Sequence, residues 1–281
     1  MLSYRHGFHA GNTGDVLKHL VVTALLRAAL RKLTPLCYVE THAGAGEYDL
    51  AHEFAARNRE FDTGIGALWD ARDAQMPALV ADYLAAVAAT NDADALRRYP
   101  GSPAIARHWL DPNDSMWLAE LHPTDNIRLV ELFAARSATH VRRRDGYELL
   151  KSVLPPRERR ALVLIDPAYE VEGEQARIVA AVSGMLKRMR HVVCAIWAPL
   201  RGKVDAERLA DAIAALQPDK LLRATLRARE GDALGSTMLV INPAFRVDVD
   251  LVEALAWVTT ALPDLDSEVT WLVGGGSLPS P

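Results

Sequence analysis

Cysteine is scarce in this sequence. Only two cysteines occur among 281 residues, Cys37 and Cys194, and both lie in apolar segments. Two residues cannot build a disulfide framework or a thiolate metal centre, so both are expected to be free thiols. This usage favours a reducing compartment, and we expect the protein in the cytoplasm.

Long hydrophobic segments are missing as well. No window of the sequence approaches the roughly 18 uncharged apolar residues that a membrane helix needs. The opening residues Met1 to His6 are not followed by the apolar core of a signal peptide. We therefore expect neither a membrane span nor secretion.

The composition excludes several further classes of protein. With 17 Gly and 15 Pro the chain is neither collagen-like nor of low complexity. A net charge of −4 argues against a protein that coats nucleic acid without specificity. The nine histidines form no cluster with cysteines and carboxylates at metal-ligand spacing, so no metal is predicted. What remains is a globular protein, which we expect to be a monomer.

Apolar segments of strand length alternate with amphipathic helical segments along the chain. This alternation predicts an α/β fold with a mostly parallel, doubly wound sheet. Seven strands are expected, at 36–40, 116–120, 139–142, 162–166, 192–197, 221–227 and 238–242. Helices are expected at 15–33, 126–136, 174–189, 204–216 and 249–262.

One connection is too long for a simple strand-helix-strand unit. The first strand ends near Glu40 and the second begins near Met116, whereas such a unit needs about 30 residues in all. Residues 51–96 are rich in alanine and apolar at helical spacing. We predict an inserted helical subdomain at 51–96, and a main domain formed by 1–50 and 97–281.

A glycine turn follows the first strand, at Glu40-Thr41-His42-Ala43-Gly44-Ala45-Gly46. Glycines at this position let backbone N–H groups approach a ligand at the carboxyl edge of the sheet. A dinucleotide fingerprint would need a third glycine at position 49, which is Asp49. The turn therefore favours a ligand without a pyrophosphate, with Gly44 close to it; taken alone, it is equally compatible with a tight turn that binds nothing.

Acidic residues follow the next two strands. Glu120 is placed where ribose hydroxyls lie in such folds, and a carboxylate accepts two hydroxyl hydrogen bonds well. Asp145 and Gly146 follow the third strand, where a carboxylate and a backbone N–H can recognise an adenine edge. The alternatives are a solvated loop residue for Glu120 and a helix N-cap for Asp145, which can serve both purposes.

The fourth strand ends in Asp166-Pro167-Ala168-Tyr169. An exocyclic adenine amino group shares its lone pair with the ring, so a catalyst must hold its hydrogens with acceptors. Asp166 and the Pro167 carbonyl can supply two acceptors, and Tyr169 offers a stacking face for a base taken out of its helix. The alternative is an ordinary turn at the end of a strand.

A similar pattern occurs at Asn242-Pro243-Ala244-Phe245. We reject Asn242 as the catalytic residue because its strand is the last of the seven and is expected toward the edge of the sheet. The strand that ends at Asp166 is expected beside the first strand and its glycine turn.

The N-terminal segment is dense in polar and aromatic residues. Tyr4, His6, Lys18 and His19 lie in it, around the start of a helix that Asn12, Thr13 or Asp15 can cap. Lys18 and His19 gain nothing from the helix dipole near an N-terminus, which favours a binding role over a structural one. The alternative is a solvated face.

Three clusters of basic residues lie near predicted strand or helix ends and can contact phosphates. Solvated surface is the ordinary explanation for such clusters. They are Arg142/Arg143/Arg144, Arg157/Arg159/Arg160 and Lys187/Arg188/Arg190.

In combination and in order, these motifs resemble one family. They are Tyr-Arg-His near the start, Asp-Val-Leu-Lys-His, Thr-His-Ala-Gly-Ala-Gly, Tyr-Pro-Gly-Ser-Pro, Glu-Leu-His-Pro, Asp-Gly and Ile-Asp-Pro-x-Tyr-Glu, and they span residues 1 to about 245. The family is the 23S ribosomal RNA adenine-N6 methyltransferases of the RlmJ type. The resemblance implies a Rossmann-like, seven-stranded class I methyltransferase fold with a small helical insertion after the first strand.

The resemblance also implies a cofactor, a partner and site residues. S-adenosylmethionine is the cofactor, 23S rRNA or its assembly intermediate is the partner, and N6-methyladenine is the product. Asp166 is implied as the catalytic acceptor, and Tyr4, His6 and Lys18 as substrate-side residues. The expected cofactor contacts are His19, His42, Ser102, Glu120, Asp145 and Gly146, together with Gly44 and Asp166. The chain departs from the pattern at Ala168, where the family usually has a second proline.

Three other functions stay open at this stage. Asp/Asn-Pro-Pro-Tyr motifs also serve enzymes that methylate DNA adenine or protein glutamine side chains, although no separate DNA-reading domain is evident here. The change at Ala168 keeps open a catalytically weak module that binds RNA or senses the cofactor. A nicotinamide oxidoreductase is least favoured because the third glycine is missing.

Overall fold

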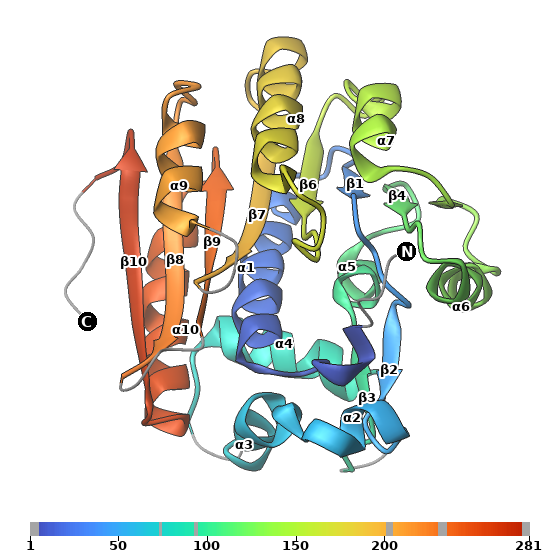
Figure 1. Ribbon diagram of the computed structural model, residues 1–281, viewed down its shortest axis with the longest axis vertical. Coiled ribbons are helices and arrows are strands. Elements are labelled where there is room, and N and C mark those ends of the chain that lie inside the picture. The colour runs from blue at the N-terminus through green and yellow to red at the C-terminus, as the bar shows by residue number, and fades with distance from the viewer. Residues whose placement is uncertain (1–5, 73–74, 93–94, 201–204, 230–234, 277–281) are drawn as a thin grey trace.

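The main sheet collects the apolar segments of the sequence into one layer. The computed structural model describes residues 6–72, 75–92, 95–200, 205–229 and 235–276. In this part eight strands form the sheet, in the order β10-β8-β9-β7-β6-β1-β4-β5 (Figure 1). Their bounds are β1 Cys37–Glu40, β4 Ser115–Ala119, β5 Thr139–Arg142, β6 Ala161–Ile165, β7 Val193–Pro199, β8 Leu221–Ala228, β9 Gly235–Ile241 and β10 Leu265–Val273.

Five neighbouring strands of the sheet are parallel. β5, β4, β1, β6 and β7 form this part, and β9, β8 and β10 extend it with antiparallel pairings. The predicted mostly parallel sheet is thus confirmed, since five of the eight strands are parallel, and the other three are antiparallel to their neighbours. β6 pairs directly with β1, as the choice of Asp166 over Asn242 requires.

The predicted strand count of seven is wrong, because β10 is an eighth strand of the main sheet. β10 pairs only with β8 and lies at the edge, so its residues stay partly exposed. Its first half contains Asp266, Ser267 and Glu268, which hide the apolar pattern that marks the other strands.

The position of β9 also corrects the reasoning about Asn242. β9 is not an edge strand; it lies between β7 and β8 and runs antiparallel to both. Its C-terminal end therefore points to the edge opposite the carboxyl ends of the parallel strands. The Asn242 side chain there donates to the carbonyls of Arg190 and Val192 and accepts from the Lys220 amide. Asn242 is a structural residue, for a reason different from the predicted one.

The helices cover both faces of the sheet. Their bounds are α1 Thr13–Leu30, α2 Glu53–Asn58, α3 Ile65–Asp70, α4 Ala78–Ala88, α5 Ser102–Trp109, α6 Pro123–Phe133, α7 Gly146–Val153, α8 Glu174–Arg188, α9 Ala206–Ala214 and α10 Val247–Ala261, with 3₁₀ turns η1 His6–Phe8 and η2 Glu60–Thr63. α7, α8 and α9 bury one core, while α1, α4, α5, α6 and α10 bury the other. Side chains along β1 alternate between the two cores. Tyr38 belongs to the core with α1, and Val39 belongs to the core with α8.

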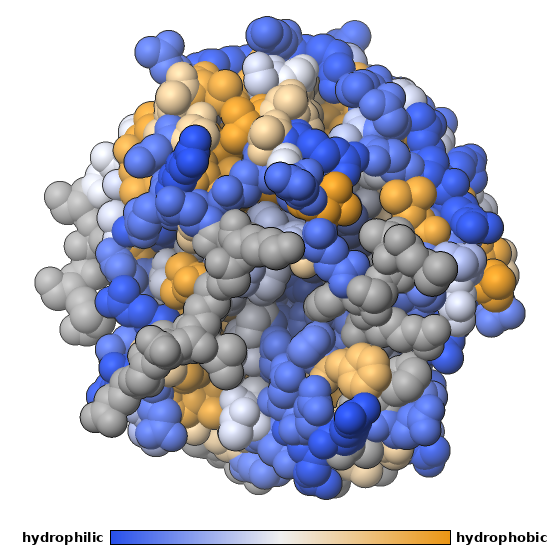
Figure 2. All heavy atoms as spheres, in the orientation of Figure 1, coloured by the Kyte–Doolittle hydropathy of each residue, from blue (hydrophilic) through white to orange (hydrophobic). Residues whose placement is uncertain are grey.

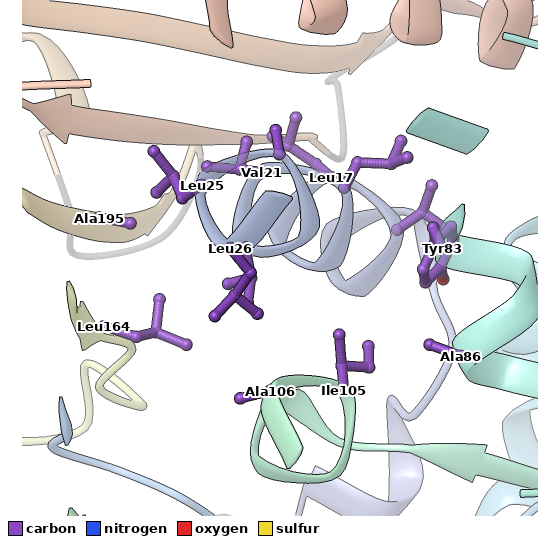
Figure 3. Close-up of a cluster of buried hydrophobic side chains, with 14 of the residues drawn as sticks. Leu17, Val21, Leu25, Leu26, Tyr83, Ala86, Ile105, Ala106, Leu164 and Ala195 are labelled. Atoms are coloured by element: carbon purple, nitrogen blue, oxygen red, sulfur yellow. The ribbon is translucent and has the colours of Figure 1, made fainter. Parts of the chain in front are cut away.

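α1 is the central helix of the larger core. Its N-cap is Asn12, whose side chain accepts a hydrogen bond from the Asp15 amide at 3.0 Å. Figure 3 shows side chains of α1 facing α4, α5 and the strands β6 and β7. The residues labelled there are Leu17, Val21, Leu25, Leu26, Tyr83, Ala86, Ile105, Ala106, Leu164 and Ala195.

The segment after β1 contains the predicted helices. It begins and ends on a two-stranded antiparallel ribbon, β2 Glu47–Asp49 and β3 Arg98–Pro100, which the sequence did not predict. Between these strands lie α2, η2, α3 and α4, with α2 and α3 at the opposite end of the molecule from α7 and α8 (Figure 1). α4 packs against α1, α5 and α10, so this segment shares the larger core with the rest of the chain.

The face of the molecule shown in Figure 2 is mainly hydrophilic where it is coloured. On the face in Figure 2, hydrophobic residues lie in several separate areas among hydrophilic ones. Within the described ranges, no helix combines the length and apolar character that crossing a membrane requires.

Candidate functional site

A pocket of about 390 Å³ opens at the carboxyl edge of the parallel strands. The segments that follow β1, β4, β5 and β6 contribute to its wall, together with the beginning of α1. This is the place where ligands bind in open α/β sheets, because the strands present polar turns there.

The glycine turn after β1 forms one wall of the pocket. Gly44 has a φ of 60°, and a Cβ at this position would lie 2.4 Å from the Tyr48 hydroxyl oxygen. Only glycine takes this conformation and this close approach without strain. The Gly44 amide donates to Glu120 Oε2 at 2.8 Å, so the turn is fixed by the residue that follows β4.

Glu120 lines the pocket, and each oxygen of its carboxylate accepts a hydrogen bond from a nearby backbone amide. Its Oε1 accepts from the His122 amide at 2.6 Å, in addition to the Gly44 bond to Oε2. Burial raises the pKa of Glu120, and the two backbone hydrogen bonds oppose that effect. Each carboxylate oxygen has a second lone pair, so the predicted hydrogen bonds to a ribose stay possible and stay a prediction.

Ser102 begins α5 and lines the pocket, but its hydroxyl points to Glu40. Ser102 Oγ donates to Glu40 Oε1 at 2.5 Å, and the Tyr38 hydroxyl donates to Glu40 Oε2 at 2.9 Å. Glu40 is fully buried, and burial raises its pKa to about 8. The sequence did not predict this buried carboxyl group beneath the pocket.

Asp145 is the N-cap of α7, as predicted, and it also lines the pocket, where its recognition of an adenine edge stays a prediction. Its side chain accepts from the amides of Tyr147 and Glu148, and its Oδ2 accepts from Arg177. Gly146 is buried against Thr41, where a Cβ would lie 2.1 Å from the carbonyl oxygen, and it is not part of the pocket wall. Gly146 has no surface open to the pocket, so its predicted contact with the cofactor stays a prediction without support from the pocket wall.

Two histidines at the pocket are held by neighbouring hydroxyls. His42 Nδ1 lies 2.8 Å from Thr41 Oγ1, and His19 Nδ1 lies 2.6 Å from the Tyr99 hydroxyl. Burial lowers the pKa of both, and lowers that of His19 well below its usual value, which favours the neutral form of each ring. His19 Nε2 is buried and has no hydrogen-bond partner among the described residues, although His19 is part of the pocket wall.

The Asp166-Pro167-Ala168-Tyr169 turn follows β6 and faces the same pocket. Asp166 Oδ2 accepts from Lys18 Nζ at 2.7 Å. Tyr169 has a φ of 55°, which is uncommon for a residue with a side chain, and its hydroxyl donates to the Trp197 carbonyl at 2.6 Å. Within the described ranges, no hydrogen bond engages Asp166 Oδ1 or the Pro167 carbonyl.

A network of charged residues connects the N-terminal segment to this turn. Asp15 is buried and bonds Lys18 Nζ at 2.7 Å and His6 Nε2 at 2.9 Å through its two oxygens. Burial opposes ionisation of Asp15, yet His6 and Lys18 hold its pKa well below the usual value. Lys18 and His6 are thus placed at the pocket, as predicted, while Tyr4 lies outside the described residues.

The sequence did not single out several residues of the pocket wall. Asp15 was considered only as a helix cap, although its spacing of three residues from Lys18 indicates a shared helix face. Arg177, Trp197 and Tyr48 also belong to the wall, and none of them stands in a motif that the sequence marked.

The polar groups of the pocket fit a polar ligand that extends along the strand ends. Trp197 Nε1 and His19 Nε2 are buried without partners among the described residues, and both residues belong to the wall. Such orphaned groups in a native structure are explained by a ligand or by water. No set of three or more His, Cys, Asp or Glu side chains in the described ranges is arranged to hold a metal ion.

The sequence matches a family model described as "Ribosomal RNA large subunit methyltransferase D, RlmJ" over residues 33–273. Ribosomal RNA large subunit methyltransferase J of Escherichia coli (strain K12) is 38% identical over 280 residues, covering 97% of this chain and 99% of that protein. The protein of the same name from Haemophilus influenzae is 37% identical over 267 residues, covering 93% and 94%.

Among solved structures, a protein from Legionella pneumophila str. Philadelphia 1 is similar over nearly the whole chain. The TM-score is 0.86 at 30% sequence identity, and the match covers 93% of this chain and 98% of that one.

Proposed function

The chain belongs to the family of ribosomal RNA large subunit methyltransferases of the RlmJ type, and from this premise we propose its reaction. It is an S-adenosylmethionine-dependent methyltransferase that forms N6-methyladenine at one adenine of 23S rRNA. Its Rossmann-like α/β fold is the class I methyltransferase fold.

One observation supports this proposal above the others. The Asp166-Pro167-Ala168-Tyr169 turn, the Gly44 turn and Glu120 face one pocket, although they come from the ends of three different strands. A site for methyl transfer to an adenine amino group needs acceptors for that group beside a nucleoside-binding surface, and this arrangement offers both.

The roles of the residues at the turn follow from the chemistry of the amino group. S-adenosylmethionine supplies an electrophilic methyl group when bound. Asp166 Oδ1 and the Pro167 carbonyl accept the two amino hydrogens, which directs the nitrogen lone pair out of conjugation with the ring. Lys18 fixes the other carboxylate oxygen at 2.7 Å and so orients the acceptor. Tyr169 stacks on the extruded base, a contact worth about 1–3 kcal/mol.

We assign the opposite side of the pocket to the cofactor. Glu120 accepts the ribose hydroxyls and Asp145 recognises the adenine edge, while His19 Nε2 has a free position for a polar group of the ligand. Gly44, His42 and Ser102 belong to the same wall, and Gly146 supports it by its close packing on Thr41.

We assign the substrate side to Tyr4, His6 and Lys18. We also propose that 1–50 and 97–281 form the methyltransferase domain and that 51–96 is an inserted subdomain. The protein is proposed to act as a monomer in the cytoplasm, without a metal ion, on 23S rRNA or its assembly intermediate.

Mass mapping of N6-methyladenine in 23S rRNA tests the proposed reaction. In a strain that lacks this gene, one N6-methyladenine is expected to disappear and to return when the gene is restored. An unchanged set of modified adenines would overturn the proposal. DNA adenine and protein glutamine, analysed in the same strain, are expected to be unchanged; loss of methylation there would identify the alternative substrates.

A further inference from the structure

Three consecutive arginines lie at the rim of the pocket. Arg142 ends β5, and Arg143 and Arg144 lead directly to Asp145, a residue of the pocket wall. All three are exposed. β5 is the edge strand on this side of the sheet, so these exposed arginines connect an edge strand to the pocket wall at Asp145.

These arginines lack the acidic partners that many other exposed arginines have. Within the described ranges, no carboxylate oxygen lies within ion-pair distance of Arg142, Arg143 or Arg144. The nearest acid in sequence, Asp145, is taken by Arg177. By contrast, carboxylates pair with Arg59, Arg97, Arg190 and Arg229. In a chain with net charge −4, three uncompensated cations in a row concentrate positive charge at this rim.

The guanidinium of Arg142 is also held in place by an aromatic pair. It lies 5.5 Å from the centre of the Trp117 ring, which packs on His140 with ring centres 4.1 Å apart. Trp117 and His140 are opposite each other on β4 and β5. Burial lowers the pKa of His140, and Arg142 and Arg157 lower it further, while Glu158 opposes this. The positive field at this edge is therefore felt by the neighbouring groups.

We propose that Arg142, Arg143 and Arg144 bind phosphates of the RNA strand next to the target adenine. The inference rests on the proposed function, and it adds the surface that holds the substrate outside the pocket. Arginine suits this task because it stays charged and offers several donors to one phosphate. Contacts to phosphates place the RNA without reading its sequence, so the adenine is selected by other contacts.

A matched pair of variants tests the inference. Arg142→Gln/Arg143→Gln removes two charges from the rim and leaves Arg144, which adjoins Asp145. Lys187→Gln/Arg188→Gln removes two charges from the C-terminal end of α8. This end leads into the start of β7, away from the carboxyl ends of the parallel strands where the pocket lies. The ligand is protein-free 23S rRNA from a strain that lacks this gene, and binding is measured by filter retention at 50–200 mM KCl.

The rim variant is expected to bind this RNA roughly tenfold more weakly at 0.1 M salt, with a slope of log Kd against log salt reduced by about 1.4, as for two lost phosphate contacts. Its KM for RNA rises, while kcat and cofactor affinity stay near the wild-type values. The control variant is expected to match the wild type. Arg142→Lys/Arg143→Lys is expected to recover most of the affinity, because the contact depends on charge.

An unchanged salt slope in the rim variant, or equal losses in rim and control variants, would overturn the inference. Normal RNA binding together with aggregation of the rim variant would show instead that the arginines protect an edge strand against pairing with other chains. If wild-type protein binds the RNA but transfers no methyl group to it, the proposed function fails instead, and the binding comparison still decides the role of the rim.

Discussion

The Asp166 carboxylate is bound on one oxygen by the protein and leaves the other oxygen for the substrate proposed above. Lys18 Nζ occupies Oδ2 at 2.7 Å, and Lys18 is itself held by Asp15, so the carboxylate is fixed from the protein side. Oδ1 is left to face the pocket. A flexible carboxylate would have to be ordered when the adenine arrives, and this arrangement removes that cost beforehand.

Glu120→Ala is expected to weaken cofactor binding by about 1.5–3 kcal/mol, the usual effect of removing a charged hydrogen-bond partner. Part of this loss arises because the Gly44 amide loses its acceptor. Isothermal titration calorimetry measures the change in cofactor affinity. Glu120→Gln keeps one acceptor oxygen, so its affinity is expected to lie between those of the wild type and Glu120→Ala. Wild-type affinity in the alanine variant would contradict the ribose role.

Ala168→Pro is expected to keep or modestly raise turnover and to raise the melting temperature slightly. Proline requires a φ near −65° and has no N–H. Ala168 has no positive φ, and its amide donates no hydrogen bond to any described residue. Steady-state kinetics decide the question: a loss of turnover greater than tenfold, or about 1.4 kcal/mol, would mean that the backbone path of this turn differs from that of its relatives.

The sequence identified the pocket residues that directly follow strands. Gly44, Glu120 and Asp166 come after apolar segments, so their place at one edge follows from the parallel sheet. Asp15 and Trp197 could not be assigned in this way. Asp15 reaches the site because α1 packs between the sheet and the inserted helices, and Trp197 lies within β7 rather than after it. Such contacts depend on packing, which a local pattern does not contain.

At the scale of elements, the segment between β2 and β3 holds the N-terminal segment. Glu60 in η2 accepts from Asn12, the N-cap of α1, at 3.0 Å and lies 2.9 Å from His9 Nδ1. The Ile65 amide donates to the Gly11 carbonyl at 2.8 Å. These contacts fix the start of the helix that carries Lys18.

Glu60→Gln is expected to lower turnover a few-fold and to speed hydrogen exchange at residues 9–18. Since His9 and Glu60 are partly exposed, the pair contributes less than about 1 kcal/mol, and global stability should change little. Glu53→Gln, an exposed change in α2 of the same insertion, is the control. Equal exchange rates in the wild type and Glu60→Gln would show that the insertion does not restrain this segment.

The element order explains which parts of the fold could be predicted. Strands with two neighbours, such as β1 and β6, bury both faces and give continuous apolar segments. β10 has one neighbour and half-exposed residues, and the β2–β3 ribbon has only three residues in each strand. Neither gives the periodic signal on which strand prediction depends.

At the scale of the molecule, the buried Glu40 beneath the pocket makes stability depend on pH. Its pKa of about 8 lies above the ordinary value of 4.5, so the folded protein holds a proton that the unfolded chain releases between these pH values. The contribution of Glu40 to the free energy of unfolding is therefore highest below pH 4.5. It falls as the pH rises through 8, by at most about 1.4 kcal/mol per pH unit.

Glu40→Gln removes this titration and is expected to flatten the pH dependence. The free energy of unfolding of the variant minus that of the wild type should be larger at pH 8 than at pH 5. The altered bonds to Tyr38 and Ser102 add a loss that is the same at both pH values, so they do not affect this comparison. Urea unfolding at both pH values measures the difference. An identical difference at the two values would show that Glu40 does not titrate in this range.

In the proposed reaction, Asp166 accepts a hydrogen of the adenine amino group during methyl transfer. This role is tested by the single-turnover rate of methyl transfer from the cofactor to 23S rRNA in the Asp166→Ala variant. The cofactor affinity of the same variant is measured as well. Asn242→Ala, in the similar Asn-Pro-Ala-Phe pattern, is the control. Asp166→Ala is expected to lose on the order of 100-fold or more in rate, with cofactor affinity within a few-fold, while folded Asn242→Ala is expected to keep a normal rate. A near-normal rate in Asp166→Ala would contradict this role.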